Sequence, residues 1–252
     1  MCRTEIQVGE TMSKIGVISD VHGNLQALNA ILAHFDEIGC DEIIHTGDVI
    51  HIGANSRECL DILLSRPDVT LILGNHDRDF LLNQSQMRYM SHVPTEHKQY
   101  VFSTLTEQHR KRIAGFPLYV TRQFAGQTVM FAHYALVDGK IDPDKYIFKM
   151  INEFPTAEAF DVLFENAHCD AVFFGHKHEP CDIKGKKLYV DIGSVGCHPR
   201  PFARGIVINY DDKCWSYERV EVPYDMEQMH QAMANVPCGE QLYNFYFLRL
   251  GK

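Results

Sequence analysis

Residues that commonly bind metals occur in short clusters, each placed directly after an apolar, β-branched run. Their oxygen and nitrogen donors suit Mn²⁺, Fe, Zn²⁺ or Ni²⁺. The eight cysteines are scattered and form no Cys-x-x-Cys pair, so a sulfur-rich site is not favoured. The clusters are Asp20-Val21-His22-Gly23-Asn24, Gly47-Asp48, Gly74-Asn75-His76-Asp77, His133 and Gly175-His176-Lys177-His178. This pattern predicts a polynuclear metal site.

Each cluster directly follows a run that is short enough to form a buried β-strand. We therefore expect strands to position the clusters. The runs are residues 15–18, 42–44, 69–73, 128–131 and 171–174. In a sheet with helices between its strands, the turns at the carboxyl edge meet in one crevice. Ligands that lie far apart in the sequence can therefore converge on one point.

The order of the expected elements indicates a mixed α/β architecture. Helices over 25–38 and 56–64 alternate with the first strands, which predicts right-handed crossovers and parallel pairing. Residues 118–124 and 127–133 are joined by Ala125-Gly126, which predicts a hairpin and antiparallel pairing. Helices are also expected within 78–112, within 143–167 and over 225–234, and strands at 170–174, 187–191, 205–210 and 214–221. Residues 243–250 fit a strand or a helix.

Charge balance favours a phosphate ester as the substrate. A carboxylate has two oxygens and can bridge two ions, and Asp48 is the natural candidate. With Asp20 also ionised, two carboxylates face the charges of two divalent ions. A net charge of about +2 is left for a hydroxide and a phosphate group to neutralise.

The four motifs Asp-x-His-Gly-Asn, Gly-Asp, Gly-Asn-His-Asp and Gly-His-x-His, in this order, resemble the calcineurin-like metallophosphoesterase superfamily. The short chain and the turn Gly193-Ser194-Val195-Gly196 resemble its compact bacterial and archaeal phosphodiesterase branch. The resemblance covers roughly residues 13–222. It implies a four-layer α/β/β/α sandwich, an α/β (α+β) fold of two mixed β-sheets flanked by helices. We expect a single metallophosphoesterase domain over 12–252, after a disordered N-terminal extension over 1–11.

The resemblance also implies a role for each motif residue. Asp20, His22, Asp48 and His178 would bind one ion, and Asp48, Asn75, His133 and His176 the other, so that Asp48 bridges. His76 would act on the leaving-group oxygen as general acid or transition-state stabiliser, with Asp77 orienting it, while a metal-bridging hydroxide attacks phosphorus. Two divalent transition metals are the expected cofactors, with Mn²⁺ favoured over Fe, Zn²⁺ or Ni²⁺.

Several other residues carry two interpretations each. Asn24 is expected to cap the helix over 25–38, in preference to contacting substrate, and Arg200 either reaches a substrate phosphate or forms a salt bridge. Tyr134 and Asp191 depart from the usual pattern of the family, and simple packing is favoured for Tyr134 over stacking on a substrate. His45 is expected to be satisfied within its strand. The other histidines are expected to be solvated or locally hydrogen-bonded: His34, His51, His92, His97, His109, His168 and His230.

Composition limits the partners. A formal charge of −9 and the lack of a Lys/Arg cluster argue against extended nucleic acid and anionic membranes, but not against a small anionic substrate beside metal ions. No stretch is apolar enough for a membrane span, and the first eleven residues lack a signal-peptide core. A cytoplasmic protein is therefore expected. The sequence leaves the formation of a homo-oligomer undecided.

Three functions remain in competition. The first is a phosphodiesterase acting on a small or nucleotide-like substrate, and the second is a phosphomonoesterase or dinucleoside polyphosphate hydrolase using the same metals. The third is a non-catalytic interaction scaffold, as in superfamily members with degenerate sites. Because every ligand position and His76 are kept, the sequence speaks against the scaffold.

Overall fold

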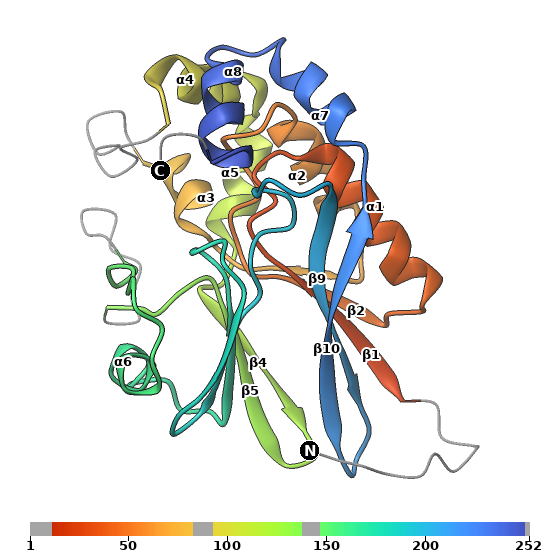
Figure 1. Ribbon diagram of the computed structural model, residues 1–252, viewed down its shortest axis with the longest axis vertical. Helices are drawn as coiled ribbons and strands as arrows, with labels where there is room; N and C mark the ends of the chain where they lie inside the picture. The colour runs from red at the N-terminus through yellow and green to blue at the C-terminus, as the bar shows by residue number, and fades with distance from the viewer. Residues whose placement is uncertain (1–11, 83–92, 138–146, 250–252) are drawn as a thin grey trace.

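Two five-stranded mixed β-sheets pack face to face, with helices on their outer sides (Figure 1). The computed structural model describes residues 12–82, 93–137 and 147–249. The predicted sandwich of two mixed sheets flanked by helices is confirmed. The predicted extension over 1–11 lies outside the described residues, as do residues 83–92, which include His92, and residues 138–146.

The first sheet has the strand order β10-β9-β1-β2-β3. Strands β1 (Ser13–Ile18), β2 (Glu42–His45) and β3 (Val69–Leu71) run parallel, and β9 (Phe202–Tyr210) pairs antiparallel with β1 and with β10 (Trp215–Pro223). Helices α1 (Leu25–Glu37) and α2 (Ser56–Ser65) connect the parallel strands. The predicted β-α-β opening is therefore present.

The second sheet has the strand order β4-β5-β6-β8-β7. Strands β4 (Tyr119–Phe124) and β5 (Gln127–Ala132) form the predicted hairpin, and β5, β6 (Ala171–Phe174) and β8 (Leu188–Asp191) are parallel. Helix α6 (Ala157–Leu163) flanks this sheet (Figure 1). The edge strand β7 (Cys181–Lys184), antiparallel to β8, was not predicted.

Helix α1 shows how the layers fit together. Its apolar stripe, which includes Leu28, Ile31 and Phe35, is fully buried. The ring of Phe35 lies so close to β1 that a Cβ at Gly16 would be 2.5 Å from Cδ2 of Phe35, so only glycine fits there. Between the two sheets lies a separate apolar layer with members from both, such as Val17 and Phe173.

The remaining helices surround one end of the sandwich (Figure 1). They are α3 (Asn75–Asp79), α4 (Thr95–Thr104), α5 (Glu107–Ala114), α7 (Met226–Met233), α8 (Gly239–Leu242) and the π-helix η1 (Tyr243–Phe247). The segment that fitted either a strand or a helix is thus helical over 243–247. No helix among the described residues is both long enough and apolar enough to cross a membrane.

Candidate metal centre

The carboxyl ends of strands from both sheets deliver ligand-type side chains to one place. Residues after β1, β2 and β3 come from the first sheet, and residues after β5 and β6 come from the second. Within each of three overlapping groups, the potential ligand atoms lie within 4.8 Å of one another. The groups are Asp20, His22 and His178; His22, Asp48 and His76; and Asp48, His133 and His176. The predicted convergence is therefore present, although it joins the edges of two sheets.

The first group has the spacing of a metal-binding set. Nε2 of His22 lies 3.0 Å from Nε2 of His178, and Oδ1 of Asp20 lies 3.7 Å and 3.4 Å from these two nitrogens. Ligands at about 2.0–2.2 Å from one ion have this kind of mutual distance. Oδ1 of Asp20 is buried and has no hydrogen-bond partner. A buried carboxylate oxygen that faces two imidazole nitrogens fits a cation.

Asp48 joins the second group to the third. Its Oδ2 lies 3.3 Å from Nε2 of His133 and 3.7 Å from Nε2 of His22. Nε2 of His133 is in turn 2.9 Å from Oδ1 of Asn75 and 3.1 Å from Nδ1 of His176. This geometry gives Asp48 the shared position and brings all seven predicted ligands together.

In two of the histidines, a hydrogen bond at Nδ1 leaves Nε2 as the nitrogen that faces the centre. Nδ1 of His22 donates to the carbonyl of Ile50 at 3.3 Å, and Nδ1 of His133 donates to the carbonyl of Thr46 at 3.2 Å. A carbonyl can only accept, so Nδ1 carries a proton, and in the neutral ring Nε2 is the nitrogen with the free lone pair. Both rings are thus prepared to bind a cation through Nε2.

Electrostatics favour the protonation states that bind metals at most of these positions. Burial lowers the pKa of His22 to about 4 and that of His176 to about 3. Burial opposes ionisation of Asp48, but the charges of His133 and His76 outweigh it and hold the Asp48 pKa well below its usual value. For His133, burial is outweighed by the Asp48 carboxylate, and the pKa rises to about 9. A proton on His133 therefore competes with a cation.

The backbone at the centre is strained. Five of the predicted ligands have a left-handed φ: Asp20 at 54°, His22 at 47°, Asp48 at 64°, His176 at 75° and His178 at 63°. Such conformations persist only where surrounding contacts determine them, and they cluster at functional sites. Asp48 also packs closely against the turn between β3 and α3. A Cβ at Gly74 would lie 2.1 Å from Oδ1 of Asp48.

Asp77 orients the Asp48 loop and not the imidazole of His76. Its two oxygens accept hydrogen bonds from the backbone N–H groups of Asp48, Val49, Ile50 and Gly74 at 2.8–3.3 Å. Burial and the charge of Asp48 raise the Asp77 pKa to about 7, whereas these four donors favour the ionised form. Nδ1 of His76, the residue that Asp77 was expected to orient, is buried without a hydrogen-bond partner.

The two predicted substrate-contacting residues lie in different surroundings. Oδ1 of Asn24 accepts from the N–H of Ala27 at 3.0 Å, which confirms the helix cap. Its Nδ2 donates to the Gly196 carbonyl and the Tyr224 hydroxyl, so its polar groups are occupied by the protein. Arg200 is exposed, with its guanidinium 5.9 Å from the ring centre of Phe202, and a role toward substrate stays a prediction.

The two departures from the family pattern are both buried. Tyr134 is fully buried with its ring 4.9 Å from that of the ligand His176, and its hydroxyl accepts from the N–H of Asn152, so it packs behind the centre as favoured. Asp191 accepts from the N–H of Gly193 through Oδ1, while burial raises its pKa well above the usual value. The other oxygen of Asp191, Oδ2, is buried without a hydrogen-bond partner.

Sequence reasoning misjudged one histidine near the centre. His51 was expected to be solvated or locally hydrogen-bonded, but it is fully buried. His97 is also buried, and its Nδ1 donates to the carbonyl of Pro237 at 3.1 Å. Neither ring nitrogen of His51 has a hydrogen-bond partner. The sequence signal that was available is the position of His51, three residues after Asp48. His45 lies within β2 as expected, and its Nδ1 accepts from the N–H of Gly47.

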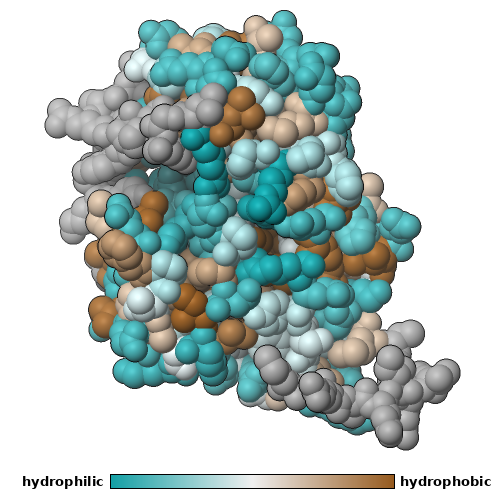
Figure 2. All heavy atoms as spheres, in the orientation of Figure 1, coloured by the Kyte–Doolittle hydropathy of each residue, from teal (hydrophilic) through white to brown (hydrophobic). Residues whose placement is uncertain are grey.

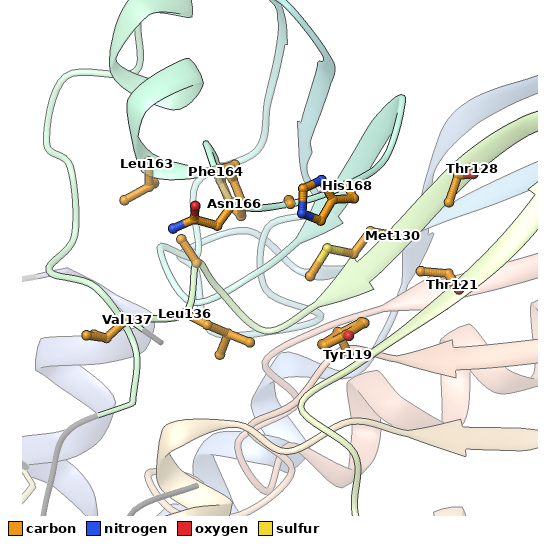
Figure 3. Close-up of a pocket in the computed structure, with 12 residues that line it drawn as sticks. Tyr119, Thr121, Thr128, Met130, Leu136, Val137, Leu163, Phe164, Asn166 and His168 are labelled. Carbon is orange, nitrogen blue, oxygen red and sulfur yellow. The ribbon is translucent and has the colours of Figure 1, made fainter. Parts of the chain in front are cut away.

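Other surface features lie apart from the metal centre. A cavity of about 500 Å³ opens on the second sheet beside the segment that follows α6, lined by Tyr119, Met130, Leu136, Leu163, Asn166 and other side chains (Figure 3). Apolar side chains also gather on the flank near α6 (Figure 2), where Met150 and Phe154 are largely exposed. None of the residues that line this cavity belongs to the three metal-type groups.

Comparison with known proteins gives concordant results. Residues 13–212 match the calcineurin-like phosphoesterase superfamily domain. An uncharacterized protein from Methanocaldococcus jannaschii is 26% identical over 252 residues, which cover 94% of this chain and 98% of the relative. A metallophosphoesterase from Sphaerobacter thermophilus has a similar structure, with a TM-score of 0.68, 22% identity and coverage of 91% of this chain and 96% of the other. A hypothetical protein from Pyrococcus horikoshii OT3 gives a TM-score of 0.75 at 17% identity, with coverage of 93% and 98%.

Proposed function

The chain belongs to the calcineurin-like phosphoesterase superfamily, and on this premise we propose that it hydrolyses phosphodiester bonds in a small or nucleotide-like substrate. The proposed site holds two divalent transition-metal ions. Its oxygen and nitrogen donors suit Mn²⁺, our first choice, and also Fe, Zn²⁺ or Ni²⁺. When bound, such ions supply Lewis acidity and a hydroxide nucleophile at neutral pH.

The shared position of Asp48 is the observation that carries this proposal. Asp48 belongs to two of the three metal-type groups and is the residue that these two groups share. Nitrogens from His22 and His133 both approach its Oδ2. A carboxylate shared by two sets of nitrogen donors supports two adjacent ions, an arrangement suited to an in-line displacement at phosphorus.

His76 is suited to the leaving-group side of the reaction. It is the second residue of α3, its side chain is 14% exposed, and its Nε2 lies 3.9 Å from Oδ2 of Asp48. It thus borders the centre without replacing a predicted ligand. From this position Nε2 can hold a proton near the departing oxygen of an ester.

The proposal is tested with metal-stripped protein that is reloaded with Mn²⁺, Ni²⁺ or Zn²⁺. The assay compares bis-p-nitrophenyl phosphate with p-nitrophenyl phosphate and a dinucleoside polyphosphate. We expect the highest kcat/KM for the diester. A preference for the monoester or the dinucleoside polyphosphate would favour the second hypothesis. If no metal-loaded sample hydrolyses any of the three, the chain is an interaction scaffold.

The control for the assay is the nearly isosteric variant Asp48→Asn. Its amide oxygen can keep the hydrogen bond that Oδ1 accepts from the His76 N–H at 2.8 Å, so the local fold is preserved. The negative charge between the two groups is lost. Turnover that persists at the wild-type rate in this variant would come from a contaminating phosphatase or from another site.

A further inference from the structure

His51 occupies an unusual position in the loop between β2 and α2. Its side chain is fully buried, and its backbone N–H donates to Oγ of Ser56 at 2.9 Å. Both His51 and the following Ile52 have a left-handed φ, of 71° and 68°. A β-branched residue such as Ile52 rarely adopts this conformation, so the loop uses a strained backbone to keep this imidazole inside.

Packing alone does not account for the imidazole. Its ring centre lies 5.1 Å from that of Phe102 and 5.5 Å from that of His76. Neither of its nitrogens has a hydrogen-bond partner. Buried polar groups are nearly always paired, and each exception calls for an explanation. An apolar ring would fill the same space without this cost.

His76 also has a buried nitrogen without a hydrogen-bond partner. Its Nε2 faces Oδ2 of Asp48, while its Nδ1, on the other side of the ring, is buried and unpaired. Asp77 does not serve Nδ1, because its oxygens accept from the Asp48 loop and from Gly74. The two neighbouring imidazoles therefore hold three buried nitrogens without partners.

We propose that His51 is a positioning residue that holds His76 in its working orientation. A nitrogen of His51 bonds to Nδ1 of His76, either directly after a small ring rotation or through one buried water. A water that serves two such nitrogens has enough polar partners to be bound in the interior. The link fixes the plane of the His76 ring and keeps Nε2 directed at the metal centre. This inference rests on the proposed function, because it assigns His76 to the leaving-group side.

Two substitutions separate hydrogen bonding from packing. His51→Phe keeps an aromatic ring against Phe102 and removes both nitrogens. His51→Asn restores a polar group close to the position of Nδ1, and asparagine tolerates the left-handed φ of 71°. The matched control is His198→Phe. His198 is also buried, has an unpaired Nε2 and lies 5.1 Å from the ring of Phe202, although its Nδ1 accepts from the backbone N–H of Arg200 at 3.3 Å.

The kinetic readout is the dependence of turnover on the leaving group. We expect His51→Phe to lower kcat about 10–100-fold for an alkyl phosphodiester, the usual effect of removing a residue that orients a functional group. The loss should be smaller for a nitrophenyl ester, whose leaving group needs no proton, and KM should change little. His51→Asn should recover part of the rate, and His198→Phe should match the wild type. A leaving-group dependence that differs from that of His76→Gln, or no loss at all, would overturn the proposal.

A second readout does not depend on turnover. In the metal-free protein, the ¹⁵N resonance of Nδ1 in His76 should shift in His51→Phe, return toward the wild-type value in His51→Asn and stay unchanged in His198→Phe. An unchanged resonance in His51→Phe contradicts the link. If the wild type hydrolyses no phosphoester, the proposed function fails, and this spectrum still decides whether His51 and His76 are joined.

Discussion

Replacing Asp48 by asparagine should weaken both metal sites, whereas the same change at Asp20 should weaken one. Oδ2 of Asp48 lies 3.3 Å, 3.7 Å and 3.9 Å from nitrogens of His133, His22 and His76. Oδ1 of Asp20 approaches nitrogens of His22 and His178, while its Oδ2 accepts from the backbone N–H of His176. The side-chain shape is nearly unchanged in either variant, so the charge is the quantity that is removed.

The size of the effect follows from these distances. An ion among the surrounding nitrogens lies within about 4 Å of Oδ2. One unit charge at that distance, at an effective dielectric constant of about 20, contributes about 4 kcal/mol for each unit of charge on the ion. Since about 1.4 kcal/mol corresponds to a tenfold change, each ion should lose affinity by a factor of about 10³ or more.

Equilibrium dialysis followed by elemental analysis measures this directly. At a free Mn²⁺ concentration that saturates the wild type, Asp48→Asn should retain fewer than one ion and Asp20→Asn about one. Circular dichroism and the thermal midpoint of the metal-free variants show whether the fold is kept. Two tightly held ions in a folded Asp48→Asn protein would refute the bridging role, as would equal losses in the two variants.

Three further outcomes are expected. The pKa of His133 is raised to about 9, so this ring is protonated at neutral pH in the metal-free protein. Metal affinity should therefore increase as the pH rises toward about 9. Calorimetry in buffers of different ionisation enthalpy should show that metal binding releases a proton at pH 7. A pH-independent affinity between 6 and 9 would contradict this. Asp77→Asn should lower the free energy of unfolding by on the order of 2–3 kcal/mol, because an amide nitrogen cannot accept from the backbone N–H groups of Asp48 and Val49. A denaturation midpoint equal to that of the wild type would show that these hydrogen bonds contribute nothing to stability. His76→Gln should lower kcat by about 10²–10⁴-fold for an alkyl diester and less for a nitrophenyl diester, and a uniform loss would indicate charge stabilisation instead of proton donation.

The metal ligands could be predicted from the sequence because each one is tied to a local pattern. A strand of three to six residues, a turn and a polar residue form a unit that the sequence displays directly, as in β1 followed by Asp20. The order of these units indicates the fold. The seven predicted ligands therefore lie together in the structure, even though they come from two sheets.

Contacts over long sequence distances could not be predicted in the same way. Asp77 accepts from Asp48 across 29 positions, and nothing in the local sequence distinguishes this from a contact with the neighbouring His76. The burial of His51 depends on α4, which supplies Phe102. The edge strand β7 has four residues that alternate between half-buried and exposed, and it is held by β8 alone, so its sequence carries little β-strand signal.

The left-handed backbone at the ligands links these observations. A non-glycine residue in this region costs roughly 1–2 kcal/mol, so five such ligands together cost on the order of 5 kcal/mol, comparable with the whole stability of many domains. The surrounding hydrogen bonds must offset this cost, and those of Asp77 to the Asp48 loop are the clearest example. A residue that touches no ion can therefore decide whether the ligands keep their places. For the same reason the strain at His51 and Ile52, which lie in that loop, indicates that the imidazole of His51 belongs to the working site.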